Sequence, residues 1–185
     1  MARLASFISL SLNGYYADEK SNMDFAHTPP DKEFGEFTTK NAQGGGRLLF
    51  GRTTYDLMKS YWPTPQAAKD MPEVAKQMNA RTKLVASRSM ERADWENTTV
   101  IKGDLAAEIS KLKKDGPDIT ILGSGSIVRQ LADAGLIDEL SVVFVPISLK
   151  GGKSYLAGVE GRRAWKVAES RAFKNGNLFV RYHPN

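Results

Sequence analysis

No other part of the sequence limits the choice of fold as much as ITILGSGSIVRQLADAG, residues 119–135. Its first four residues have the composition of a short buried strand, and Ile127 and Leu131 recur at helical spacing after the Gly-Ser-Gly-Ser turn. A strand that leads directly into a helix is the repeating unit of an α/β protein. Two roles of the glycines stay open at this level: they permit a sharp turn, or they expose N–H groups at a helix N-terminus that binds an anion.

Predicted strands and helices alternate along the rest of the chain. Helical connections early and an Asn175-Gly176 hairpin turn late predict a mixed, mostly parallel sheet. The predicted fold class is α/β with three layers, in which helices flank the sheet and a β-hairpin ends the chain. No linker, repeat or change of composition divides the sequence, so residues 1–185 are expected to form a single domain. The expected strands are residues 4–12, 48–50, 82–87, 98–101, 119–122, 139–147, 165–173 and 177–183, and the expected helices are residues 29–42, 53–61, 72–80 and 104–114 together with the one after the glycine-rich turn.

Composition removes several classes of function. The chain has no cysteine, which excludes disulfides, thiolate metal sites and a cysteine nucleophile. The two histidines, His27 and His183, are too distant in sequence to suggest a metal site, so no metal is expected. The net charge of +5 is spread along the chain without a basic cluster, which argues against a nucleic-acid partner.

The N-terminal segment and the length of the apolar runs bear on location. Spanning a membrane takes about 20 consecutive apolar residues, and no segment of the sequence approaches that length. Apolar residues at the N-terminus alternate with serines and lead into Asn13-Gly14, which indicates a strand and a turn instead of a signal peptide. We therefore expect a cytoplasmic protein without a membrane partner.

Two further strand ends carry an arginine between hydroxyl side chains. In RLLFGRTTYDLM an apolar strand is followed by glycine, Arg52 and two threonines that open a helix, and in TKLVASRSM a strand ends at Ser87 and Arg88. A guanidinium beside a helix N-terminus is repelled by the helix dipole unless a bound anion offsets both charges. Helix capping by Thr53 or Thr54 is the simpler explanation of the hydroxyls. Three such strand ends together favour a ligand with several phosphates across the carboxyl ends of the strands.

Known phosphate-binding motifs fit only in part. Gly123 and Gly125 match the start of the dinucleotide fingerprint, but Val128 occupies its third glycine position and the motif lies late in the chain. The lysine and hydroxyl that end a Walker-type loop are absent. Two arginines at separate strand ends suit the additional 2′-phosphate of NADP better than they suit NAD.

LLFGRTTYDLM and ITILGSGSIVRQL resemble the two cofactor motifs of the dihydrofolate reductase fold. SFISLSLNGYYA and AGLIDELSVVFVPISLKGGKSYL are similar to segments of one branch of that fold, named after the reductase (C-terminal) domain of riboflavin biosynthesis enzymes. Asn13 stands where that branch usually has aspartate. The resemblance covers nearly the whole chain. It implies an eight-stranded mixed sheet, NADPH as the cofactor and a homodimer.

The resemblance also implies roles for particular residues. Arg52 and Thr53 would lie near the 2′-phosphate, and Ser87 and Arg88 beside the adenosine. The glycine-rich turn would pass under the pyrophosphate, with Thr54 close by. The full set of expected cofactor-binding residues is Gly51, Arg52, Thr53, Thr54, Ser87, Arg88, Gly123, Ser124, Gly125, Ser126 and Ile127.

Catalytic and substrate-binding residues are expected around the nicotinamide. The resembled folate reductases use a carboxylate on the first helix as proton source, a position that falls at Gly35, with Glu36 adjacent and Asp31 one turn earlier. Because Glu36 is expected on the solvent side of that helix, water and the Tyr16 hydroxyl compete with it as proton source. The catalytic candidates are therefore Tyr16 and Glu36. Candidates for substrate contacts are Asn13, Trp62 and Tyr155.

The predicted function is an NADPH-dependent reductase that transfers a hydride to a small heterocyclic or carbonyl compound, similar to riboflavin-biosynthesis reductase or dihydrofolate reductase. The alternative is an NADPH-binding module without efficient catalysis, which the missing first-helix carboxylate keeps open. Neither a folate nor a riboflavin-type substrate follows from the residues, because the acidic signature of the riboflavin reductases is also absent.

Overall fold

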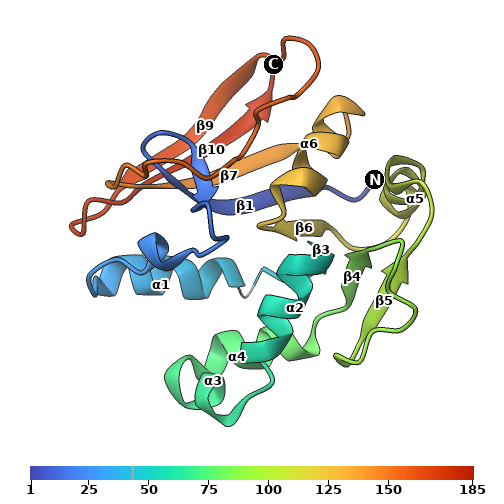
Figure 1. Cartoon of the computed structure of the whole chain (residues 1–185), viewed down its shortest axis with the longest axis horizontal. Helices are drawn as coiled ribbons and strands as arrows, with labels where there is room; N and C mark the ends of the chain where they lie inside the picture. Colours follow the sequence, from blue (N-terminus) through green and yellow to red (C-terminus); the bar gives the residue numbers. More distant parts are fainter. Residues whose placement is uncertain (43) are drawn as a thin grey trace.

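The computed structural model describes residues 1–42 and 44–185, through which an eight-stranded sheet runs (Figure 1). The strand order is β5-β4-β3-β6-β1-β7-β10-β9, in which the first six strands are parallel to one another and β10 is antiparallel to its neighbours β7 and β9. The strands are β1 (Leu4–Ser11), β3 (Arg47–Gly51), β4 (Lys83–Ala86), β5 (Thr98–Ile101), β6 (Ile119–Leu122), β7 (Glu139–Val145), β9 (Trp165–Ala172) and β10 (Leu178–Pro184). The predicted mixed, mostly parallel sheet with its C-terminal hairpin is confirmed.

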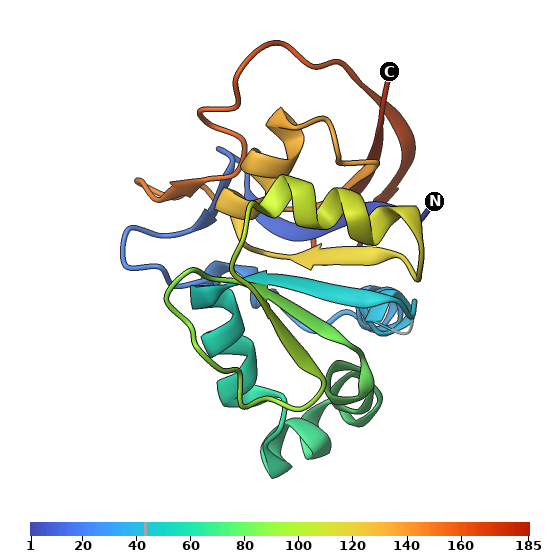
Figure 2. The same ribbon diagram turned by 90° about the vertical axis from the view of Figure 1, so that its right-hand side faces the viewer.

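Helices cover both faces of the sheet and produce the three predicted layers (Figure 2). On one face Leu4 and Ile8 of β1 pack in one core cluster with Ile109 of α5 and Leu131 of α6. On the opposite face, which α1, α2 and α4 cover, Phe37 of α1 packs with residues of β7 and β10. None of the helices in the described part of the chain is long and apolar enough to cross a membrane. The helices are α1 (Lys32–Ala42), α2 (Arg52–Tyr61), α3 (Pro65–Asp70), α4 (Pro72–Ala80), α5 (Leu105–Lys114) and α6 (Gly125–Asp133), with a short 3-10 turn at Asp24–Ala26.

Three elements were not among those predicted from the sequence. No helix was predicted between residues 61 and 72, but α3 begins at Pro65, where the Thr64 hydroxyl accepts a hydrogen bond from the Ala67 N–H at 3.2 Å. A capping threonine followed by proline is a common start of a helix, and this signal outweighed the prolines as loop formers. The short strands β2 (Tyr15–Ala17) and β8 (Lys153–Ser154) pair with each other and join the segment after β1 to the segment after β7.

Asp31 joins the first helix to the C-terminal hairpin. Its carboxylate accepts hydrogen bonds from the backbone N–H groups of Phe34 and Asn175, each at 3.0 Å. The Phe34 N–H is the main cause that lowers the pKa of Asp31. This carboxylate therefore caps α1 and holds the turn between β9 and β10, which removes Asp31 from the candidates for a proton source.

Lys83 is a fully buried cation at the start of β4. Its Nζ donates to the carbonyl oxygens of Met78, Asn79 and Arg81 at 3.0, 2.9 and 2.7 Å, and it lies 4.6 Å from the centre of the Trp95 ring. These carbonyls surround the end of α4, so the ammonium group neutralises the negative end of that helix. Burial lowers the pKa of Lys83 to about 8.

We expect Lys83→Met to lower the free energy of unfolding by about 1–3 kcal/mol at neutral pH, because the carbonyls at the end of α4 lose their donor. The folded pKa of about 8 lies below the ordinary value of 10.5, so the unfolded chain binds more protons between these two pH values. The contribution of Lys83 to the free energy of unfolding of the wild type therefore increases as the pH rises from about 8 toward 10.5. Urea unfolding of both proteins at about pH 7 and about pH 9.5 measures the effect. A difference in the free energy of unfolding between the wild type and Lys83→Met that is smaller at about pH 9.5 than at about pH 7 would contradict this account.

Candidate functional site

The three strand ends selected from the sequence lie side by side. β4, β3 and β6 are neighbours in the parallel part of the sheet, so their carboxyl ends share one edge. α2 and α6 both begin at that edge, as Figure 1 shows. The residues brought together there are Gly51, Arg52, Thr53, Thr54, Ser87, Arg88, Gly123, Ser124, Gly125, Ser126 and Ile127.

Ser124 ties the glycine-rich turn to the start of α2. Its Oγ accepts a hydrogen bond from the Gly51 N–H and donates one to Thr54 Oγ1, each at 2.8 Å. Gly123 and Ser124 both have left-handed backbone conformations, with φ of 61° and 55°. Such a conformation costs a non-glycine residue about 1–2 kcal/mol, which the two hydrogen bonds of Ser124 help to offset. The turn leaves the first N–H groups of α6 without partners inside the helix, as an anion site requires.

The start of α2 differs in detail from the prediction. Gly51 is the N-cap residue of α2, and no side chain caps this helix. Thr54 instead accepts the hydrogen bond from Ser124. Arg52 lies exposed on the helix surface, where its Nε donates to Asp56 Oδ2 at 2.7 Å. Arg88 is exposed near the same edge, so both guanidinium groups are accessible to an anion.

The ring of Tyr16 lies against Gly125 at the start of α6. A Cβ atom added at Gly125 would be 2.5 Å from Cε1 of Tyr16. Burial raises the pKa of the Tyr16 hydroxyl, and the charge of Arg129 on α6 partly opposes this shift. A neutral phenol ring therefore packs against Gly125, the first residue of α6.

A cavity of about 400 Å³ lies on the face of the sheet that α1, α2 and α4 cover. At the carboxyl ends of the strands its wall includes Ser9, Thr54 and Gly123, so the cavity adjoins the edge just described. The Trp62 indole N–H points at the sulfur of Met58, 3.1 Å away, within this wall. Apolar side chains form much of the wall, namely Phe7, Met23, Met58, Trp62, Val74, Met78 and Leu122.

Among the described residues, most ionisable side chains in the cavity wall lie at its other end, and Arg181 lies further along the sheet, in register with Ser141 and Phe7. Arg3, Arg81 and Asp118 come just before β1, β4 and β6, Glu139 begins β7, and Arg181 lies beside it on β10. The carboxylate of Glu139 is 3.3 Å from Nη1 of Arg3 and 3.2 Å from Nε of Arg181. Burial lowers the pKa of Arg81, and one of its buried Nη atoms has no hydrogen-bond partner within residues 1–42 and 44–185. Those residues also contain no group of three or more His, Cys, Asp or Glu that could hold a metal ion.

Two residues expected at the substrate are placed elsewhere. Tyr155 is buried in the core of the opposite face, where its hydroxyl shares a hydrogen bond of 2.5 Å with Ser6 Oγ and burial raises its pKa. The Asn13 side chain is engaged with Leu149: Nδ2 donates to the carbonyl at 2.7 Å and Oδ1 accepts from the N–H at 3.1 Å. Neither residue lines the cavity, and the contact of Tyr155 and Asn13 with a substrate stays a prediction. Trp62, the third candidate, lines the cavity.

The two catalytic candidates also lie outside the cavity wall. The Glu36 side chain is 68% exposed, and its Oε1 is 3.9 Å from Nζ of Lys32 on the helix surface. Tyr16 packs on α6. Neither side chain is part of the cavity wall, and the role of Glu36 or Tyr16 as the proton source stays a prediction. α1 presents Thr38 and Asn41 to the cavity instead.

We expect Glu36→Gln to lower turnover less than tenfold, which corresponds to less than about 1.4 kcal/mol of transition-state stabilisation, because the side chain is solvated. Steady-state NADPH oxidation measures this. Lys32→Gln serves as the matched control, since it removes the other half of the same surface ion pair. A loss of about a hundredfold in Glu36→Gln alone, with unchanged NADPH affinity, would identify Glu36 as the acid after all.

Several cavity residues had no distinctive signal in the sequence. Ser9 follows Phe7 at an interval of two, which predicts that both point to one face of β1. Nothing in that local pattern indicates that the face borders a cavity. Met23 and Met58 come from separate segments, and only the packing of α2 and the 3-10 turn against the sheet brings them to one wall.

The fold is dihydrofolate reductase-like. A dihydrofolate reductase from Enterococcus faecalis, solved in complex with NADP(H) and RAB-propyl, matches with a TM-score of 0.64 and 18% identity, over 99% of this chain and 96% of that one. A putative riboflavin biosynthesis protein from Shewanella sp. PV-4 matches with a TM-score of 0.79 and 24% identity, over 100% and 99% of the two chains. At these identities the likeness concerns the fold.

Residues 3–179 match the model of the RibD C-terminal domain, and the chain belongs to that family. One relative is the uncharacterized protein YyaP of Bacillus subtilis (strain 168), which is 27% identical over 184 residues that cover 99% of this chain and 95% of the relative. The resemblance predicted from the sequence motifs is thereby confirmed for both the family and the fold.

Proposed function

We propose that this chain, as one domain spanning residues 1–185, is a cytoplasmic NADPH-dependent oxidoreductase that reduces a small heterocyclic or carbonyl compound. The proposal rests on one observation. The three strand ends whose sequence patterns favour phosphate binding lie side by side at one edge of the sheet, beside a cavity of about 400 Å³. Ligands of open α/β sheets bind at the carboxyl ends of the strands. Membership of the RibD C-terminal domain family supports the proposal.

The residues at this edge fit a cofactor of the NADP type. Arg52 and Arg88 offer two exposed guanidinium groups for phosphates, and the first turn of α6 offers N–H groups for the pyrophosphate. Gly123 has a left-handed backbone conformation, with φ of 61°, which favours glycine in the turn. When bound there, NADPH supplies a hydride. The protein residues bind the phosphates, orient the ring toward the cavity and exclude water.

The first test measures cofactor binding and turnover in the same preparation. Fluorescence titration gives the NADPH affinity, and the loss of NADPH absorbance is followed with a panel of pterins, folates, ribosylaminopyrimidines and simple carbonyl compounds. We expect NADPH to bind and at least one class to be reduced. Absence of NADPH binding to the folded protein would contradict the proposal.

A second candidate, an NADPH-binding module without efficient catalysis, is favoured by one observation. The first helix offers no carboxylate to the cavity, because Asp31 caps α1 and Glu36 faces solvent. In this case NADPH would bind with the same affinity as in a reductase, and no member of the panel would be reduced. Turnover with any member excludes this candidate.

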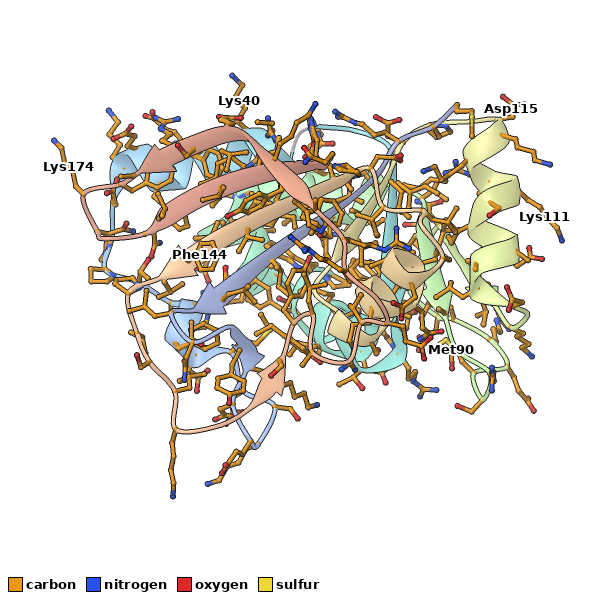
Figure 3. The ribbon with its side chains drawn as sticks, turned by 90° about the horizontal axis from the view of Figure 1, so that it is seen from above. Lys40, Met90, Lys111, Asp115, Phe144 and Lys174 are labelled. Atoms are coloured by element: carbon orange, nitrogen blue, oxygen red, sulfur yellow. The ribbon has the colours of Figure 1, made fainter. Side chains whose placement is uncertain are left out.

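We expect a homodimer that forms through the face of β9 and β10 that no helix of the described residues covers. Figure 3 looks onto this face: α5, marked by Lys111 and Asp115, lies to one side, and no helix lies over β9 and β10. The side chains of Val167 and Leu178 are 60% and 40% exposed there, and β9 is an open edge strand. Exposed apolar side chains beside an open edge are a liability in a monomer.

Light scattering at micromolar concentration is expected to return twice the mass of one chain. Val167→Asp combined with Leu178→Asp should shift the protein to monomers, because two carboxylates would be buried at the interface. A wild type that scatters as a single chain would contradict the homodimer.

A further inference from the structure

The carboxylates of the cavity wall lie apart from the cofactor edge, which is the edge formed by the carboxyl ends of β4, β3 and β6 where NADPH is proposed to bind. Glu139 pairs in register with Ala5, four residues before Ser9, which places this buried carboxylate about 13 Å from Ser9 along β1. Glu139 is also neutralised by Arg3 and Arg181. Among the described residues, a compound beside the cofactor therefore meets no carboxylic acid in the cavity wall.

Hydroxyl groups are the polar side chains at the cofactor end of the cavity. Thr54 Oγ1 accepts a hydrogen bond from Ser124 Oγ, and this bond holds the Thr54 hydroxyl against the glycine-rich turn. Ser9 lies half-buried on the face of β1 that borders the cavity. An alcohol donates a hydrogen bond to a substrate oxygen, but it is too weak an acid to protonate a substrate before hydride transfer.

The rest of this wall suits a flat, conjugated ring. Met23 and Met58 line the cavity between its two ends. Methionine sulfur gains about 0.3–1.5 kcal/mol from contact with an aromatic ring, and its flexible side chain adapts to different outlines. Trp62 and Met78 lie toward the charged end of the cavity, since the Trp62 carbonyl accepts a hydrogen bond from Asn79, two residues before Arg81.

The missing acid restricts which compounds can accept the hydride. The imine nitrogen of a dihydropterin becomes a good acceptor only when it is protonated, and this step calls for an acid within reach. A quinone accepts a hydride without prior protonation, because the electron pair is delocalised as a phenol-type oxyanion. The conjugate acid of that oxyanion has a pKa near the value of about 10 found for tyrosine, so water can protonate it afterwards.

Resting on the proposed function, we propose that this site reduces a conjugated carbonyl compound of the quinone type, whose carbonyl oxygen takes a hydrogen bond from Ser9. One quinone, one NADPH and one proton give one hydroquinone and one NADP⁺. The C–H bond of the reduced nicotinamide breaks, and the transferred hydride forms the first O–H bond on one quinone oxygen, which leaves the other oxygen as an oxyanion. The two electrons reside on the product oxyanion until a proton from water forms the second O–H bond.

The test compares two acceptors with the same protein and NADPH under anaerobic conditions. 1,4-Naphthoquinone serves as the quinone and 7,8-dihydropterin as the imine, each corrected for the reaction without protein. We expect kcat/KM to be at least about 100-fold higher for the quinone, the range that a general acid normally contributes to reduction of the imine. For the quinone, kcat/KM should not change between about pH 6 and about pH 8.5, because no side chain supplies a proton in the reaction.

Variants at Ser9 test the hydrogen bond. Ser9→Ala should lower kcat/KM for naphthoquinone by about three- to tenfold, the range for one lost hydrogen bond, and Ser9→Thr should retain the rate. The affinity for NADPH should be equal in all three proteins. An unchanged rate in Ser9→Ala would overturn the role of Ser9.

The outcomes separate this inference from the proposed function. Faster reduction of the dihydropterin than of the quinone would overturn the inference and leave the reductase assignment intact. NADPH binding without reduction of either acceptor would overturn it in favour of the binding module. Failure of the folded protein to bind NADPH would contradict the proposed function itself.

Discussion

Gly125→Val is expected to abolish NADPH binding while the protein stays folded. The added Cβ would lie 2.5 Å from Cε1 of Tyr16, which is far inside contact distance. Gly125 is also the first residue of α6, where a β-branched side chain would stand between the helix N-terminus and a phosphate group. We expect the affinity for NADPH, measured by fluorescence titration, to fall at least about a hundredfold, or about 2.7 kcal/mol. Circular dichroism and the unfolding midpoint establish that the variant is folded.

A double variant separates the two causes of this loss. Tyr16→Ala removes the ring, so Gly125→Val in that background no longer meets Cε1. If the displaced ring alone prevents binding, the double variant should regain the affinity of Tyr16→Ala. If the backbone must approach the phosphate at Gly125, the double variant should still fail to bind. Wild-type affinity in a folded Gly125→Val single variant would show that the glycine serves only the turn.

NADPH is expected to bind at least about tenfold more tightly than NADH, and Arg52→Ala to remove most of this difference. A charge-assisted hydrogen bond from a guanidinium to a phosphate contributes about 1.5–3 kcal/mol, which corresponds to at least a tenfold ratio. Arg52 is already held by Asp56 at 2.7 Å, so its side chain is ordered before the phosphate arrives. Calorimetric titration of both cofactors gives the ratio.

Lys59→Ala is the matched control for this experiment. It removes one positive charge from the last turn of the same helix, where Lys59 pairs with Asp94 away from the strand end. The NADPH to NADH ratio should therefore be the same as in the wild type. Equal affinities of the wild type for the two cofactors would contradict the assignment of Arg52 to the additional phosphate.

The separate strand ends could be read from the sequence because each is a local pattern. Leu48 to Phe50 before Gly51, and Ile119 to Leu122 before Gly123, combine buried strands with turn residues and an amphipathic helix. Hydrophobic spacing and glycine conformation act within about ten residues, and they predict strand, turn and helix without knowledge of the rest of the chain. The family resemblance rests on these same local motifs.

The sequence alone did not place the loops that meet these motifs. Asn13 and Tyr155 appeared to be available for a substrate, but the pairing of β2 with β8 turns the Asn13 side chain toward Leu149 and buries the Tyr155 hydroxyl against Ser6. These contacts join residues more than 130 positions apart. No local pattern encodes such a pairing, because it depends on which backbone groups remain free after the main sheet has formed.

By itself the sequence determined the α/β class, the order of most elements and the residues at three strand ends. Only the tertiary structure decided that β4, β3 and β6 are neighbours, that Tyr16 packs against Gly125, and that the cavity holds its carboxylates far from Ser9. The physical reason is the distance along the chain over which each interaction acts. Backbone conformation and burial are set by neighbours in sequence, whereas strand order and the walls of a cavity are set by side chains that meet only when the whole chain has packed.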